Sequence, residues 1–157
     1  MNLSLNFSTD ELETSQTAIR AGRPNKIPTH LLPNAKHLAQ TILQPLRDYV
    51  MRPVFVTSGF RSGWLNRKVG GSPASAHVLA LAADLVVTGM TPMQVCDLID
   101  RIDLPYDQLI YEFGRWTHVS AAEPGKVPRR QKLTIGWRGN EVVTLAGFVP
   151  IIDGVIV

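Results

Sequence analysis

The spacing of apolar positions divides this chain into a helical first part and a strand-rich second part. Between residues 33 and 50 the apolar side chains recur every three or four positions, which is the spacing of one buried helix face. We expect Pro45, which lies off this face, to kink the helix because proline removes a backbone hydrogen bond. The apolar stripe consists of Ala35, Leu38, Ala39, Ile42, Leu43, Leu46 and Val50.

Two further helices are predicted from their start signals. Residues 8–22 begin with a Ser-x-x-Glu capping box and end at a glycine, which predicts one short helix. Residues 91–103 begin with Thr-Pro-x-Gln, which combines a capping box with proline at the first helical position. Cys96 falls among the apolar positions of this helix, so we interpret it as a buried structural thiol.

Short runs rich in β-branched and aromatic residues predict strands in the rest of the chain. A glycine-rich loop at 61–73, with one helical turn, follows the first run, and the apolar tail 145–157 is interpreted as a closing strand or a docking segment. Because helices come first and strands cluster later, we predict an α+β fold with N-terminal helices packed on a small, mostly antiparallel sheet. The predicted strands are 53–58, 79–87, 107–113, 116–122, 132–137 and 141–148.

Length and composition are those of an ordinary globular protein. The 157 residues are 45% hydrophobic and 18% charged, so we expect a single domain over residues 1–157 that is monomeric. A single cysteine excludes an internal disulfide, so packing or a metal must supply the stability. No apolar stretch reaches the ~18 residues of a membrane span. The first residues lack the pattern of a secretory signal, so we expect synthesis in the cytoplasm.

The net charge of +3 is compatible with an anionic partner such as nucleic acid, a membrane surface or a cell-wall polymer. No nucleic-acid motif accompanies the charge, so we do not expect nucleic-acid binding. The basic cluster Arg129, Arg130 and Lys132 could face an anionic glycan, although a solvated loop explains it more simply. His30 and His37 are interpreted as residues on a helix surface.

An apolar run at 78–87 carries two ionisable residues, His77 before it and Asp84 within it. On one helix these side chains would be about 10 Å apart, too far to share an ion with ~2 Å ligand bonds. On one straight strand, an odd separation would place them on opposite faces. A common site therefore requires His77 in the loop, Asp84 on the strand, and a turn between them.

His118 is the best candidate for a third ligand. On its predicted strand it shares a face with Trp116 and Ser120 rather than with the aliphatic residues. Two histidines and one carboxylate suit a single Zn²⁺ ion with a fourth position open to water. Glu112 is the candidate general base, because a three-residue hairpin turn would place it on the same face as His118, whereas a two-residue turn would not.

The segments "SGFRS", "VGGSPASAH", "AADL" and "WTHVS" resemble the zinc peptidases of the D-Ala-D-Ala carboxypeptidase type, which share their fold with the hedgehog signalling domain. The resemblance covers roughly residues 30–122, and the N-terminal segment is similar to phage and prophage members. It implies one zinc ion on His77, Asp84 and His118, with Glu112 as the catalytic base.

The same resemblance implies further roles and one departure. Arg61 would contact the substrate or the developing oxyanion, although a surface salt bridge is the plain alternative for such a residue. Ser75 would help to position the peptide. Family members usually carry glycine where this chain has Ala80, which adds a methyl group where the backbone needs freedom.

The implied function is zinc-dependent hydrolysis of a bond in the peptidoglycan stem peptide, as a carboxypeptidase or an endopeptidase. Arg61, Arg67 and Arg115 are all candidates to bind a terminal carboxylate, so the sequence leaves that choice open. The protein would act on the bacterial cell wall, after holin-mediated release or as part of a virion. The alternative is a catalytically silent zinc-containing binding module on the same fold.

Overall fold

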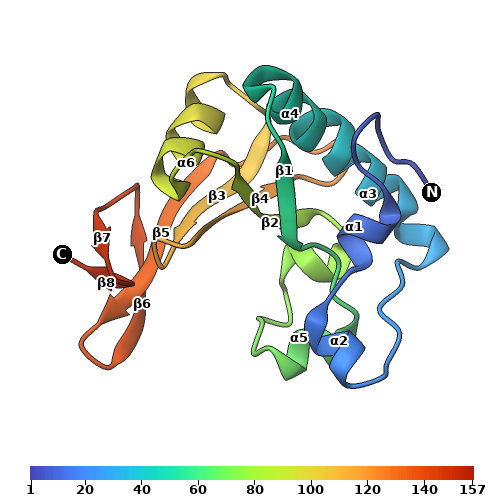
Figure 1. Ribbon diagram of the computed structural model, residues 1–157, viewed down its shortest axis with the longest axis horizontal. Coiled ribbons are helices and arrows are strands. Elements are labelled where there is room, and N and C mark those ends of the chain that lie inside the picture. Colours follow the sequence, from blue (N-terminus) through green and yellow to red (C-terminus); the bar gives the residue numbers. More distant parts are fainter.

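One eight-stranded sheet organises the chain, and the helices α3, α4 and α6 pack over it. The computed structural model describes residues 1–157 (Figure 1). The strand order is β1-β2-β4-β3-β5-β8-β7, with β6 paired to β5 outside this path. All neighbouring strands are antiparallel except β3–β5 and β5–β8, so the predicted α+β fold with a mostly antiparallel sheet is confirmed.

The helices are mostly short, and three of the helical segments are not α-helical. The α-helices are α1 (Thr9–Glu13), α2 (Gln16–Arg20), α3 (Leu32–Leu38), α4 (Gln44–Val50), α5 (Gly63–Lys68) and α6 (Pro92–Arg101). The remaining segments are the 3₁₀-helices η1 (Thr29–Leu31) and η3 (Ala76–Leu79) and the π-helix η2 (Ala39–Leu43).

The first six of the eight strands lie where the sequence predicted strands, with small shifts at their ends, and the last two lie in the C-terminal tail. The strands are β1 (Val54–Ser58), β2 (Ala82–Val87), β3 (Tyr106–Glu112), β4 (Trp116–Ala121), β5 (Gln131–Arg138), β6 (Glu141–Ala146), β7 (Ile151–Ile152) and β8 (Val155–Ile156).

The helix predicted over residues 33–50 is continuous in the structure as α3, η2 and α4. Its central turn is widened to a π-helix, in which the Gln44 N–H bonds to the Ala39 carbonyl, five residues earlier. Pro45 follows directly and has no N–H to donate to the carbonyl of Thr41. The wider turn accommodates this missing bond, so the helix changes locally from α-helical to π-helical just before Pro45.

The single helix predicted over residues 8–22 is wrong, because the chain forms α1 and α2 there. The capping box of Ser8 and Glu11 starts α1 as expected. Thr14 is then extended, and the Ser15 side chain accepts a hydrogen bond from the Ala18 N–H to start a second helix. The Ser-Thr pair thus ends one helix and caps the next, as these residues favour caps over helix interiors.

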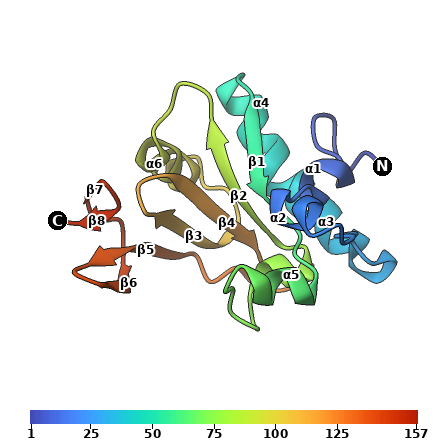
Figure 2. The ribbon, with the colours of Figure 1, turned by 60° about the horizontal axis from the view of Figure 1, so that its bottom comes forward.

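The C-terminal tail is a hairpin rather than the single closing strand or docking segment that was predicted. Asp153 and Gly154 both have positive φ, which makes the two-residue turn between β7 and β8. The hairpin joins the sheet where Val155 pairs with Trp137 of β5. Figures 1 and 2 show these strands at the end of the molecule farthest from the N-terminal helices.

Alternation along β2 and β4 separates the sheet into a packed face and an open face. Leu85 pairs with Thr117, whose hydroxyl bonds to the Pro92 carbonyl and lies 3.6 Å from the Cys96 sulfur of α6, so these positions face the helices. Asp84 and His118 pair at the next position and therefore point to the opposite face. The helix-covered face supplies much of a core of 27 buried residues.

The basic loop before β5 is neutralised by acidic neighbours, so it does not offer a free cationic patch. Arg129 forms a bidentate pair with Asp107, at distances from 2.7 to 3.1 Å. Arg130 pairs with Asp103 at 2.8 Å, and Lys132, near the start of β5, pairs with Asp100 at 3.1 Å. No helix combines the length and the apolar character needed to cross a membrane.

Replacing Leu43 with alanine is expected to lower the free energy of unfolding by about 2–5 kcal/mol, because it opens a cavity in the core under the sheet. The Leu43 side chain is fully buried in η2, whereas Leu5 is 86% exposed. Leu5→Ala is therefore the matched control and should change stability by less than ~0.5 kcal/mol. Urea denaturation followed by circular dichroism measures both, and equal losses would contradict the assigned core.

Candidate metal centre

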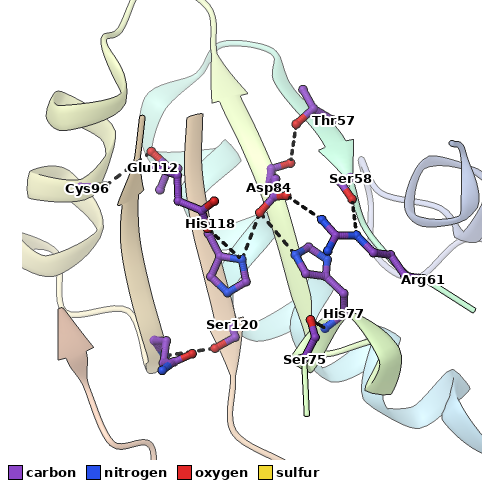
Figure 3. Close-up of polar contacts among 12 residues, drawn as sticks. Thr57, Ser58, Arg61, Ser75, His77, Asp84, Cys96, Glu112, His118 and Ser120 are labelled. Carbon is purple, nitrogen blue, oxygen red and sulfur yellow. Dashed lines mark hydrogen bonds and ion pairs between the residues drawn. The ribbon is translucent and has the colours of Figure 1, made fainter. Parts of the chain in front are cut away.

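Three buried side chains from separate elements converge on the open face of the sheet. His77 comes from η3, Asp84 from β2 and His118 from β4, and each offers one ligand atom within 4.8 Å of the other two. Figure 3 shows the Asp84 carboxylate between the two imidazoles. The structure thus brings together the three residues that the sequence singled out as metal ligands.

A turn between η3 and β2 brings His77 back over the strand that follows it. Ser75 caps η3 by accepting a hydrogen bond from the His77 N–H at 3.3 Å. At the other end of η3, Ala80 adopts a left-handed conformation with φ of 57° and is buried. This is the chain reversal that the sequence argument required, and Ala80 makes it where the resembling family usually has glycine.

The orientation of each histidine is set by its hydrogen bonds. The His77 Nδ1 lies 2.6 Å from the Gly59 carbonyl oxygen, so Nδ1 donates to that oxygen and Nε2 faces Asp84. Gly59 also lies directly against α1, because a Cβ there would be 2.6 Å from the Leu12 carbonyl oxygen. The Gly59 carbonyl as acceptor was not foreseen from the sequence.

The donor atoms fit a zinc ion in kind and in spacing. Asp84 Oδ1 lies 3.3 Å from His77 Nε2 and 3.0 Å from His118 Nδ1. Tetrahedral zinc with bonds of about 2.0–2.1 Å to nitrogen and oxygen would separate neighbouring ligand atoms by about 3.3 Å. Two imidazole nitrogens and one carboxylate oxygen are also the ligand set of catalytic zinc sites that keep one position open.

Asp84 is held in its charged form by its surroundings. Burial alone would raise the pKa of this carboxyl, but the hydrogen bonds with His118 and His77 hold the pKa well below its usual range. Arg61 bonds the second carboxylate oxygen, Oδ2, at 3.3 Å, while its Nε donates to the Ser58 hydroxyl. The guanidinium therefore leaves Oδ1 as the oxygen that faces the histidines.

Glu112 lies beside this cluster, at the position that a three-residue turn predicted. Phe113, Gly114 and Arg115 connect β3 to β4, so Glu112 pairs with Trp116 and faces the same side as His118. Its Oε1 is 3.9 Å from His118 Nδ1. Burial and the nearby negative charge of Asp84 raise the pKa of Glu112 to about 7, against smaller opposing effects of neighbouring groups.

The metal cluster and Glu112 line one large cleft, here called the central cleft, with a volume of about 840 Å³. Arg61 and Ser75, the two predicted substrate contacts, also line it, as does Trp116. Arg129 lies on its wall but is engaged by Asp107. A cleft of this volume lies within the range of ~300–1,000 Å³ typical of ligand sites.

The other candidate residues lie apart from this site. His30 in η1 and His37 in α3 are not part of the metal cluster. Cys96 is buried, and burial raises the pKa of its thiol to about 12, as expected of a structural cysteine rather than a nucleophile. Trp64 lies in α5 outside the central cleft, where the Arg23 guanidinium stacks on its ring.

Ala80→Val is expected to lower the free energy of unfolding by about 2–3 kcal/mol. A β-branched residue is strained at positive φ, and its larger side chain overfills a buried site. For Ala80→Gly, relief of ~1–2 kcal/mol of strain is offset by the lost methyl burial and the greater freedom of the unfolded chain. That variant should therefore stay within about 1 kcal/mol of the parent. Urea denaturation measures both, and equal losses in the two variants would contradict the strain at Ala80.

The metal-free protein is expected to bind one zinc ion per chain. At a free zinc concentration 100 times the Kd, binding should add ~2.7 kcal/mol to the free energy of unfolding and thereby raise the unfolding temperature. His118→Gln should lose this binding, because it removes one of the three ligands. His37→Gln is the control and should keep full zinc content. Atomic absorption and thermal unfolding report the two quantities, and zinc retained by His118→Gln at parent affinity would contradict the ligand set.

The comparisons with known proteins bear on the part of the chain that forms this site. No curated protein matches the chain. A family model described as Peptidase M15 matches residues 5–120, a range that contains all three candidate ligands and Glu112 and ends before β5. With its metal-ligand cluster and adjacent carboxylate inside that range, the chain belongs to the Peptidase M15 family.

Proposed function

We propose that this protein is a zinc-dependent peptidase that hydrolyses a bond within the peptidoglycan stem peptide. The observation that carries the proposal is the carboxyl group of Glu112, placed beside a His-Asp-His cluster within one cleft. Membership of the Peptidase M15 family supports peptidase chemistry at this cluster. The peptidoglycan substrate rests on the resemblance of the sequence motifs.

A zinc ion held by His77, Asp84 and His118 would supply a Lewis acid that polarises the peptide carbonyl and acidifies a water molecule. Glu112 accepts the proton of the attacking water and then delivers it to the leaving amine. A general acid–base group works best when its pKa lies near the working pH, and burial brings the pKa of Glu112 to about 7.

Arg61 and Ser75 have donors left over for the substrate. The Arg61 guanidinium carries five N–H donors, and its bonds to Ser58 and Asp84 use two of them. The others can hydrogen-bond the oxygen on which negative charge develops during attack. The Ser75 hydroxyl accepts from the His77 N–H, so its own O–H can donate to the peptide backbone.

The cations around the central cleft do not choose between a carboxypeptidase and an endopeptidase, so the proposal covers both. A terminal carboxylate needs a cation that is free to pair with it. Arg129 lines the cleft but is paired with Asp107, whereas Arg61 keeps donors beyond those that bind Ser58 and Asp84. Arg115 lines the smaller pocket that adjoins the cleft and has no ion-pair partner. Arg67 is not among the residues of the cleft. An internal stem-peptide bond makes no such demand. Either enzyme would serve in cell-wall remodelling or phage lysis.

Glu112→Gln is expected to lower kcat/KM on stem-peptide substrates by about 10²–10⁴-fold, because it removes the general base while preserving side-chain volume. Its zinc content should remain that of the parent. Digestion of purified muropeptides, with mass spectrometry of the products, measures the activity and identifies the bond. A chelator should abolish product formation by the parent.

Glu141→Gln is the matched control, since Glu141 is an exposed glutamate of β6, outside the central cleft. Its activity should equal that of the parent. Parent-level cleavage by Glu112→Gln would overturn the role of Glu112. Zinc binding with no cleavage of any muropeptide by the parent would instead favour a catalytically silent binding module.

A further inference from the structure

A second, smaller pocket adjoins the central cleft and shares a wall with it. This aromatic pocket has a volume of about 230 Å³ and is lined by Phe113, Arg115, Trp116, Trp137, Asp153 and Gly154. Phe113 and Trp116 line the central cleft as well. A ligand that occupies both hollows therefore passes directly over the turn that follows Glu112.

The β3–β4 turn and the C-terminal strands build this pocket together. Phe113 has a φ of 53°, and its N–H bonds to the Ile135 carbonyl of β5 at 2.8 Å. Its ring lies 5.7 Å from that of Trp116 and 6.1 Å from that of Trp137. The Trp137 N–H bonds to the Gly154 carbonyl at 2.8 Å, which ties the β7–β8 turn to β5.

The aromatic surface of the pocket is left partly open to solvent. Trp137 is 42% exposed, although an indole ring contributes most to stability when it is buried. Trp137, Asp153 and Gly154 also lie beyond the range 5–120 matched by the family model. The pocket is therefore built by the β3–β4 turn within the matched range together with C-terminal strands beyond it.

Two charged side chains of opposite sign stand in this pocket without partners. Arg115 and Asp153 are exposed, and neither forms an ion pair or a side-chain hydrogen bond. By contrast, the three cations of the loop before β5, which are Lys126, Arg129 and Arg130, are all paired with carboxylates. The pocket thus combines aromatic faces with the unpaired N–H donors of Arg115 and the unpaired carboxylate oxygens of Asp153.

We propose that the aromatic pocket binds one N-acetylated hexosamine ring of the peptidoglycan glycan strand, an inference that rests on the proposed function. A pyranose ring has a C–H face that packs on aromatic rings, and hydroxyl and amide groups that pair with Arg115 and Asp153. An apolar side chain of a peptide bound in this pocket would leave Arg115 and Asp153 without partners. The volume lies below the ~300 Å³ at which pockets for larger ligands begin, so it suits a single ring.

The position of the pocket agrees with this occupant. The stem peptide is joined through a lactyl group to a sugar of the glycan strand, so a substrate carries that sugar close to the first residues of its peptide. A ring packed against the exposed face of Trp137 would direct the attached peptide past Phe113, over the shared wall, into the central cleft. The pocket would then select peptides that are still joined to glycan.

Binding of a peptide-free N-acetylglucosamine tetrasaccharide to the zinc-loaded protein tests the inference without relying on hydrolysis. Calorimetry should show binding by the parent, no binding of maltotetraose, and affinity lowered about tenfold or more in Trp137→Ala, the order expected for loss of one aromatic contact. Arg115→Ala is the second variant, because its exposed, unpaired side chain can be removed without disturbing the fold. Trp64→Ala is the control and should bind like the parent.

Cleavage assays then separate this inference from the proposed function. The ratio of kcat/KM on a disaccharide-linked stem peptide to that on the free peptide should fall about tenfold in Trp137→Ala and not in Trp64→Ala. Failure of the parent to bind the tetrasaccharide, or equal binding by all variants, would overturn the sugar subsite even if peptides are cleaved. Sugar binding without cleavage of either peptide would overturn the peptidase function alone.

Discussion

Compensation of one buried negative charge is the constraint on which the site depends. Asp84 is placed in the middle of a sheet, where desolvation of an unpaired carboxylate would cost several kcal/mol. His77, His118 and Arg61 contribute the compensating contacts, and each comes from a different segment. In this fold, a charged and buried Asp84 therefore depends on bringing these three segments together. The convergence of segments that compensates the charge of Asp84 also brings together three ligand atoms that could hold a cation.

One face of the sheet packs against the helices and supplies the core, and the other face carries the candidate site. Leu85, Thr117 and Val119 pack under the helices, while Asp84 and His118, one position away on the same strands, face the cleft. A shift of register by one residue between β2 and β4 would break the pairing of Asp84 with His118. It would also turn polar side chains of one strand toward the helices in place of aliphatic ones. The core therefore fixes the metal cluster indirectly, because the register that buries the aliphatic residues is the register that pairs Asp84 with His118.

The sequence predicts most of this arrangement because the informative signals are local. Strand alternation placed His118 on the polar face, and the count of three turn residues placed Glu112 beside it. The contacts that were not foreseen are long-range and involve groups without a sequence signature. The Gly59 carbonyl that fixes His77 is one such group, and the Asp107 partner of Arg129 is another. A backbone acceptor looks the same at every residue, so only the assembled fold shows which one is used.

Strain in the backbone marks the two places at which the chain is bent to complete the site. Ala80 and Phe113 both occupy the left-handed region, which is unfavourable for any residue with a side chain. Each follows a functional segment: Ala80 ends the turn that carries His77, and Phe113 comes directly after Glu112. Glycine would relieve the strain at either position, but at Phe113 it would also remove an aromatic wall shared by two hollows. The phenyl ring held at positive φ contacts Trp116 and Trp137, and it thereby connects the turn after Glu112 to β5.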